Sequence, residues 1–152
     1  MESLGTERVH SRPIWLLQLV RWEWTEAMIG QFTLLVAARA TEDDLSKIQI
    51  RRFASDAVAS GCGSVLAWGE GCDLVHDLFD HAALSADRFV MSSSSRGPLS
   101  DALYEALVFD FPAEGARDCP VVLAVEEPWV AEVRRLATDQ DELARLYTSV
   151  SK

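Results

Sequence analysis

Residues 32–38, which read FTLLVAA, decide the fold because they are apolar at every position but one. A strand with one solvated face alternates apolar and polar side chains, whereas a continuous apolar run is typical of a parallel strand buried on both faces. Further runs of β-type residues occupy 14–20, 64–68, 88–92 and 121–125. We therefore predict a central parallel strand at 32–38 and four more strands in the same sheet.

Segments of helical period separate these strands. Apolar residues recur at a spacing of three and four over 41–61, 72–83 and 98–107. Alternation of strands with helices predicts a mostly parallel sheet with helices on both faces. We expect a single α/β domain over residues 1–152, a three-layer α/β/α arrangement of Rossmann-like or flavodoxin-like type with about five strands.

The two ends of the chain and one internal segment carry weaker patterns. Residues 1–12 could be disordered, and residues 21–31 could form a strand extension, a loop or a short helix. The C-terminal helical region, 128–150, has apolar residues that step by four and three, the spacing of a coiled-coil seam. Asp139, with Glu142 three residues later, resembles a capping box. We favour two short helices that pack on the sheet, and one long helix that forms a homodimer is the alternative.

Composition narrows the class of protein. The 152 residues include 14 Lys and Arg against 24 Asp and Glu, a net charge of −10, and 49% of them are apolar. This balance fits one soluble globular domain and argues against nucleic acid as a partner, because phosphate binding needs a basic face. The longest apolar runs fall far short of the ~20 residues that cross a bilayer, so we expect no membrane association.

Cysteine use and the N-terminal residues bear on compartment and cofactors. The odd number of cysteines, Cys62, Cys72 and Cys119, does not suggest a disulfide framework, and the first residues lack the apolar core of a signal peptide. We expect a cytoplasmic protein. The sequence has neither a P-loop nor a Gly-x-Gly-x-x-Gly fingerprint, and no Cys-x-x-Cys or His-x-x-x-His pair to bind a metal. We therefore expect no cofactor and no metal.

Polar and aromatic residues follow the predicted strands at their carboxyl ends, which we call the rim. Ligands of open α/β sheets bind beyond these ends, so we expect a ligand or protein partner to engage the rim. The residues that we expect to bind it are Trp68, Glu70, Asp77, Ser94, Glu126, Glu127 and Trp129. The rim is acidic, and the stretch from Phe53 to Asp87 contains no Lys or Arg. Such a field attracts a basic protein partner or a small cationic ligand.

The helix predicted over 72–83 carries a candidate catalytic group. Cys72, His76 and Asp80 are spaced four residues apart, which places them in one column of the helix. Cys72 lies near the helix N-terminus, where the helix dipole favours a thiolate, and His76 could act as its base, oriented by Asp80. A half-buried Cys72 beside a histidine at the border of the buried face is the simpler interpretation.

Several of these motifs occur together in a known family. The sequence contains, in order, Gly61-Cys62, Ala67-Trp68-Gly69 with Cys72, His76-Asp77 and Arg88-Phe89-Val90-Met91. Over residues 30–130 this series resembles a family of small uncharacterised bacterial proteins with a domain of unknown function. The resemblance implies an α/β fold and no established activity. In that family Arg-Phe-Val-Met is followed by Thr-Trp-His or similar, where this chain has serines, which puts an enzymatic role in doubt.

Three functions stay open on the sequence alone. The first is a non-enzymatic module that binds a ligand or protein partner, favoured by tryptophans such as Trp22, Trp24 and Trp129 that we expect to be exposed. The second is a cysteine-dependent hydrolase or transferase that uses Cys72 and His76. The third is a structural subunit that dimerises through its C-terminal helical region.

Overall fold

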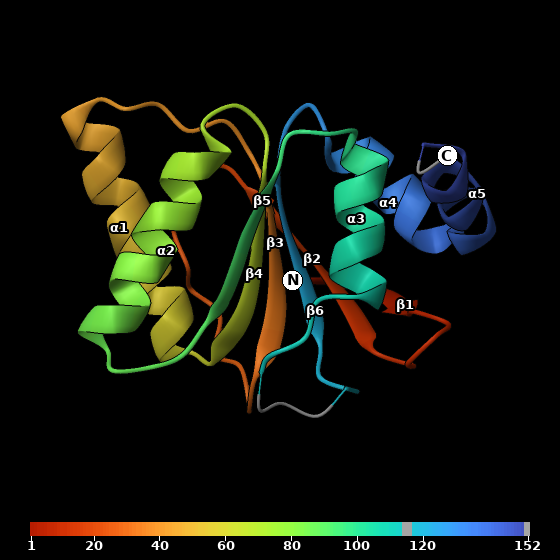
Figure 1. Cartoon of the computed structure of the whole chain (residues 1–152), viewed down its shortest axis with the longest axis horizontal. Coiled ribbons are helices and arrows are strands. Elements are labelled where there is room, and N and C mark those ends of the chain that lie inside the picture. Colours follow the sequence, from red (N-terminus) through yellow and green to blue (C-terminus); the bar gives the residue numbers. More distant parts are fainter. Residues whose placement is uncertain (114–116, 151–152) are drawn as a thin grey trace.

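The structure of the protein, a computed structural model, describes residues 1–113 and 117–150. Its elements in chain order are β1 (Glu2–Thr6), β2 (Pro13–Leu19), β3 (Phe32–Ala37), α1 (Asp44–Ala59), β4 (Cys62–Trp68), α2 (Cys72–Ser85), β5 (Met91–Ser95), α3 (Leu99–Val108), β6 (Val121–Glu126), α4 (Val130–Thr138) and α5 (Gln140–Val150). The strands form one six-stranded sheet in the order β1-β2-β6-β3-β4-β5. Figure 1 shows this sheet between a layer made of α1 and α2 and a layer that includes α3 and α4. The predicted three-layer α/β fold is confirmed, with six strands in place of about five.

All strands except β1 run parallel to one another, which is why apolar runs alternate with helices in the sequence. β6 lies between β2 and β3, and β4 and β5 follow on the other side of β3. The central strands are buried on both faces: every residue of β3 is buried, as are the first five of β6. Because parallel strands share one direction, their carboxyl ends all meet at the rim.

An edge strand and a buried arginine hold the N-terminal residues. β1 pairs antiparallel with β2 at one edge of the sheet. The Arg12 side chain is fully buried, and its Nε donates to the carbonyl of Cys119 at 3.0 Å while Nη1 donates to that of Ala106 at 3.2 Å. Residues 1–12, for which disorder was left open, therefore contain a strand and an anchor. The sequence pattern missed β1 because an edge strand of mostly exposed residues has no apolar run.

The segment 21–31 is a loop, and its tryptophans turn inward. Trp24 is buried and stacks on Phe32, with ring centroids 5.2 Å apart. Trp22 is half-buried and meets the ring of Phe53 edge to face at 5.3 Å. The prediction that these two tryptophans are exposed is wrong, because the loop folds back over the face of the sheet that α1 covers and adds aromatic rings to that core.

β5 begins later than the strand that the sequence predicts at 88–92, and the serine run itself is the strand. Its register places Ser95 beside Trp68 of β4. β5 is the outermost strand on its side, with β4 as its neighbour in the sheet. An edge strand can present hydroxyl side chains to solvent, so residues typical of a loop are compatible with pairing there.

The C-terminal region forms two helices, α4 and α5, in place of one long helix, as favoured from the sequence. The expectation that both pack on the sheet holds for α4 only. Asp139 separates the helices, and its side chain accepts a hydrogen bond from the backbone N–H of Glu142 at 3.3 Å.

α4 contacts β1, β2 and β6, whereas α5 packs mainly on α3 and α4. Gln140 of α5 also reaches the sheet, since its Nε2 donates to the carbonyl of Thr6 in β1 at 3.1 Å. Tyr147 of α5 stacks on Tyr104 of α3, with centroids 4.3 Å apart. Three apolar residues of this seam, Val133, Leu136 and Leu143, are therefore buried within the chain itself.

The length and composition of the helices bear on whether any of them could cross a membrane. The longest helix in the described residues is α1, with 16 residues. In that part of the chain no helix combines the length and the apolar composition needed to cross a bilayer.

Candidate functional site

At one position in the sheet, two neighbouring strands are followed by helices that lie on opposite faces. β3 and β6 lie side by side, but β3 leads into α1 on one face and β6 leads into α4 on the other. This divergence opens a crevice at the rim, the place where open α/β sheets bind their ligands. Arg39 lies just beyond β3, and Trp129 lies just beyond β6.

A cavity of about 680 Å³ opens at the rim, lined mostly by the connections that follow β4 and β5 and completed by residues beyond β3 and β6. Its volume falls in the range of small-molecule sites, roughly 300–1,000 Å³. Aromatic and charged side chains line it together with the backbone of a glycine-containing turn. The lining residues are Arg39, Glu42, Trp68, Gly69, Glu70, Gly71, Cys72, Asp73, Leu74, Arg96, Gly97 and Trp129.

Two tryptophans form an aromatic corner in the cavity. Trp68 ends β4 and Trp129 precedes α4, and their rings meet edge to face with centroids 5.1 Å apart. The indole Nε1 of Trp68 donates to the carbonyl of Gly97 at 2.8 Å, which fixes the orientation of that ring. The guanidinium carbon of Arg39 lies 5.6 Å from the centre of the Trp129 ring, a cation–π contact. The corner is therefore held in place before any ligand binds.

The charged residues of the cavity fall into one paired and one unpaired set. Asp73 accepts hydrogen bonds from Ser94 Oγ at 3.0 Å and from Arg96, and these contacts lower the pKa of Asp73 below its ordinary value of 3.8. The same contact with Asp73 raises the pKa of Arg96. By contrast, the carboxylates of Glu42 and Glu70 have no ion-pair partner among the described residues. The lining is left with two free negative charges and the stacked Arg39.

Two glycines bring Glu70 to the cavity. Gly69 and Gly71 have φ values of +115° and +80°, and a Cβ at Gly71 would lie 2.1 Å from the carbonyl oxygen of Ala40. Because Gly69 and Gly71 have no side chains, the turn lies close against the segment that follows β3. There the N–H of Ala40 donates to the carbonyl of Glu70 at 2.8 Å. Only glycine fits both requirements, the positive φ and the close approach.

The structure gathers some of the expected rim residues in the cavity and leaves others outside it. Trp68, Glu70, Cys72 and Trp129 line the cavity. Ser94 reaches it only through its hydrogen bond to Asp73. Glu126 is half-buried at the end of β6, Glu127 is exposed and accepts a hydrogen bond from Gln18 at 3.4 Å, and Asp77 lies further along α2; none of these three is in the lining.

Four charged lining residues were not among the predicted binding residues. They are Arg39, Glu42, Asp73 and Arg96. Arg39 follows directly on the strand predicted at 32–38, and Arg96 follows the strand predicted at 88–92 after three serines. The rule that ligands bind beyond strand ends therefore applied to both. Asp73 carried no such signal, because on a helix its position resembles that of any solvent-facing carboxylate.

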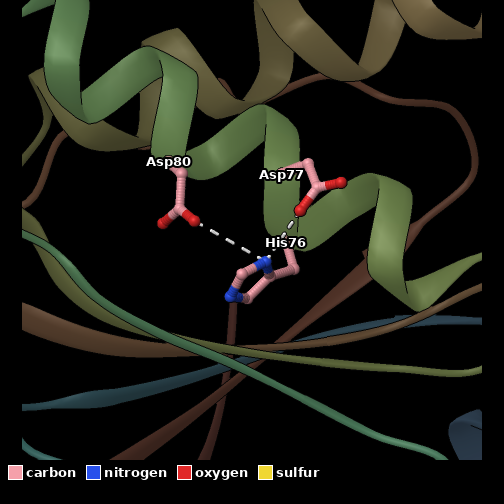
Figure 2. Close-up of side chains that lie close together, drawn as sticks. All are labelled: His76, Asp77 and Asp80. Atoms are coloured by element: carbon pink, nitrogen blue, oxygen red, sulfur yellow. Dashed lines mark hydrogen bonds and ion pairs between the residues drawn. The ribbon is translucent and has the colours of Figure 1, made fainter.

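The proposed column of Cys72, His76 and Asp80 does not form a nucleophile–base pair in the structure. Cys72 is buried. The Nδ1 atom of His76 lies 3.1 Å from Oδ1 of Asp77 and 3.6 Å from Oδ2 of Asp80 (Figure 2). Its Nε2 lies 3.2 Å from Oγ of Ser92. Both ring nitrogens of His76 thus face groups other than the thiol.

The remaining cysteines lie away from the rim. Cys62 begins β4, at the opposite end of the strand from Trp68, and burial raises the pKa of its thiol to about 12. Cys119 is also buried, and its carbonyl and sulfur accept from Arg12. All three thiols are free and buried.

Comparison with known proteins gives a family. The chain matches the model of a family described as Domain of unknown function (DUF7684) over residues 14–139. This range contains β3 through α4 and nearly all of β2, and therefore every residue that lines the cavity. No curated protein and no solved structure matches the chain.

Proposed function

The chain belongs to the DUF7684 family of unknown function, and we propose that it is a non-enzymatic binding module whose rim cavity takes a positively charged group. The group is carried either by a small ligand or by a basic side chain of a protein partner. The observation that carries the proposal is the aromatic corner of Trp68 and Trp129 beside the unpaired carboxylates of Glu42 and Glu70.

Cation recognition by an aromatic corner has a simple physical basis. The face of an indole ring attracts a cation, by about 0.5–2 kcal/mol depending on how far water is excluded. Arg39 supports the proposal, since its guanidinium already lies over the Trp129 ring. A ligand cation beside Arg39 could make the same kind of contact with an indole ring, and the carboxylates of Glu70 and Glu42 would accept its hydrogen bonds.

The wider charge distribution supports a cation over an anion. The two arginines of the lining are outnumbered by Glu42, Glu70 and Asp73, and Glu126 and Glu127 lie at the end of the neighbouring strand β6. Residues from Phe53 to Asp87 add further acids and no Lys or Arg. Such a field raises the local concentration of cations near the rim.

Binding fits the lining better than catalysis does. Cys72 is the one thiol in the lining, and within the described residues no hydrogen bond joins it to a histidine or carboxylate that could act as a base. A cavity with oriented aromatic rings and charges but without a paired nucleophile and base is suited to hold a ligand.

The proposal is tested by titrating the full chain with two cationic probes. N-acetyl-arginine amide represents a small ligand, and an alternating Arg-Gly octapeptide represents a basic partner, with calorimetry and tryptophan fluorescence as readouts. We expect Glu70→Gln and Trp129→Leu each to weaken binding about tenfold, because each removes a contact of about 1.4 kcal/mol. Glu132→Gln, the same change on the exposed surface of α4, should leave binding unchanged.

The two probes distinguish the source of the cation. Binding of the small probe assigns a small ligand, and binding of the peptide alone assigns a protein partner. The proposal is overturned if neither probe binds, if Glu132→Gln weakens binding as much as Glu70→Gln, or if N-acetyl-aspartate amide binds more tightly than the arginine probe.

A further inference from the structure

Three side chains converge on the outer face of α2, outside the lining of the rim cavity. His76, Asp77 and Asp80 each offer one ligand atom, and these atoms all lie within 4.8 Å of one another. Figure 2 shows the imidazole of His76 with both carboxylates turned toward the same ring nitrogen, Nδ1. The three residues come from about one turn of the helix, so the backbone fixes their spacing.

The hydrogen bonds of Ser92 determine which nitrogen of His76 carries a proton. Ser92 lies on β5, and its hydroxyl donates its single proton to Asp80. The same oxygen lies 3.2 Å from Nε2 of His76 and so can only accept from that nitrogen. Nε2 is therefore protonated, and in the neutral ring the lone pair of Nδ1 points at the two carboxylates.

A lone pair that faces two carboxylates is unfavourable unless a cation lies between them. Within the described residues neither Asp77 nor Asp80 has a Lys or Arg partner, and the segment from Phe53 to Asp87 contains none. A metal ion bound by Nδ1 and the two carboxylates would supply that positive charge.

The spacing of the atoms suits a metal ion. The distances from Nδ1 to the two oxygens are 3.1 and 3.6 Å. An ion about 2.1 Å from Nδ1 and from each oxygen would subtend angles of roughly 95° and 118°, which lie near octahedral and tetrahedral values. The third separation, between the two carboxylate oxygens, is within 4.8 Å, and rotation of the exposed Asp77 side chain can shorten it to the ~4.2 Å that such an ion spans. The Nε2–H bond to Ser92 is the outer contact that histidines bound to a metal commonly make, where it fixes the ring and its tautomer.

We propose that His76, Asp77 and Asp80 bind one divalent transition-metal ion, with Ser92 as a positioning residue. One imidazole and two carboxylates favour ions such as Zn²⁺ or Mn²⁺ over Mg²⁺ or Ca²⁺, which prefer oxygen ligands alone. The sequence expectation of no metal rested on cysteine and paired-histidine spacing, which does not cover a site made of one histidine and two aspartates. This site and the rim cavity share no residue, so each proposal can fail alone.

The test is a calorimetric titration of the full chain with ZnCl₂ and with MnCl₂, after treatment with a chelator. We expect one ion per chain. His76→Gln and Asp80→Asn should weaken binding tenfold or more, and Ser92→Ala roughly tenfold, since outer contacts of metal ligands are commonly worth that much. His81→Gln is the matched control, because His81 lies on the same helix and is exposed.

A second measurement shows whether the metal ion binds at Nδ1 of His76. In the nitrogen-15 NMR spectrum at neutral pH, Zn²⁺ should shift the Nδ1 resonance of His76 and leave that of His81 in place. The proposal is overturned if neither ion binds, if His81→Gln weakens binding as much as His76→Gln, or if Zn²⁺ leaves the Nδ1 resonance of His76 in place. Circular dichroism of each variant shows that the fold is intact.

Discussion

Asp110, which follows the end of α3, illustrates how burial can dominate the pKa of a single residue. Burial raises the pKa of its carboxyl from 3.8 to about 6, the charge of Glu105 adds to the rise, and Arg12 opposes it. One oxygen of Asp110 has no hydrogen-bond partner among the described residues. The folded protein therefore holds this carboxyl in its protonated form more strongly than the unfolded chain does.

We predict that Asp110→Asn stabilises the protein at neutral pH. Below pH 3.8 Asp110 is protonated in both the folded and the unfolded chain and contributes nothing to the pH dependence of stability. Between pH 3.8 and 6 the unfolded chain loses this proton first, so the free energy of unfolding falls as pH rises. Above pH 6 the folded protein bears the full cost of the buried charge. That cost is at most about 3 kcal/mol, from a difference of roughly two pKa units. Urea unfolding at pH 4 and pH 7 measures it.

The comparison needs a control that shares the charge change. Asp118→Asn removes an exposed carboxylate and should leave the free energy of unfolding nearly unchanged at both pH values. If Asp110→Asn gained no more stability at pH 7 than at pH 4, Asp110 would not be the buried acid described here.

Single residues are also where sequence-based prediction is weakest. Trp22, Trp24 and Trp129 look alike as tryptophans in or beside loops, yet Trp24 is core, Trp22 packs against the core and Trp129 lines the cavity. What distinguishes them is the path of the loop over α1, a long-range feature with no local pattern. Arg12 was missed for the same reason, since its partners lie about a hundred residues away in sequence.

At the scale of an element, the turn between β4 and α2 sets the shape of the cavity. We predict that Gly71→Ala destabilises the protein by roughly 2 kcal/mol or more, because its φ is +80° and the new Cβ would lie 2.1 Å from the carbonyl oxygen of Ala40. The backbone must shift to relieve this contact. Thermal unfolding, together with arginine-probe titration, measures both effects.

Gly97→Ala is the matched control, since Gly97 also lines the cavity. A Cβ there would have its nearest neighbour at 3.9 Å, and the φ of Gly97 lies outside the left-handed region. We expect little change in stability. Equal destabilisation by the two substitutions would show that neither the φ nor the contact at Gly71 matters.

Strands differ in how well they can be predicted from the sequence. β3 and β6 were predicted almost to the residue, because burial on both faces demands a continuous apolar run. β1 and β5 lie at the edges of the sheet, where one side of the backbone has no neighbouring strand and side chains can be polar, so β1 was missed and β5 was placed too early.

At the scale of the whole molecule, the packing of α5 bears on the oligomeric state. Leu143 of α5 is 1% exposed and belongs to the core that α3 and α4 share. We predict that Leu143→Ala costs about 2–5 kcal/mol, the usual effect of a large-to-small change in a core. Sedimentation should give the mass of one chain for both the native protein and the variant.

Leu45→Ala serves as the control, because Leu45 is 65% exposed on α1 and should contribute little to stability. A native mass of two chains that falls to one in Leu143→Ala, with little loss of stability, would instead place Leu143 in a dimer interface.

The fold class was predictable from the sequence and the arrangement of the cavity was not. Apolar strand segments that alternate with helices imply a parallel sheet. In a parallel sheet the carboxyl ends of all strands lie at one rim. Which strands are neighbours is decided by pairing between distant segments. That pairing brings Arg39 beside Trp129, and it could not be derived from either local sequence.

The position of β6 also bears on how the protein is made. Among the six strands of this sheet, β6 is the last to leave the ribosome, yet it occupies the middle of the sheet between β2 and β3. Until Val121–Glu126 emerges, β2 and β3 each present an open backbone edge that another chain can join. The sheet therefore closes in one late step, and a nascent chain that stalls before Val121 leaves the edges that promote aggregation exposed.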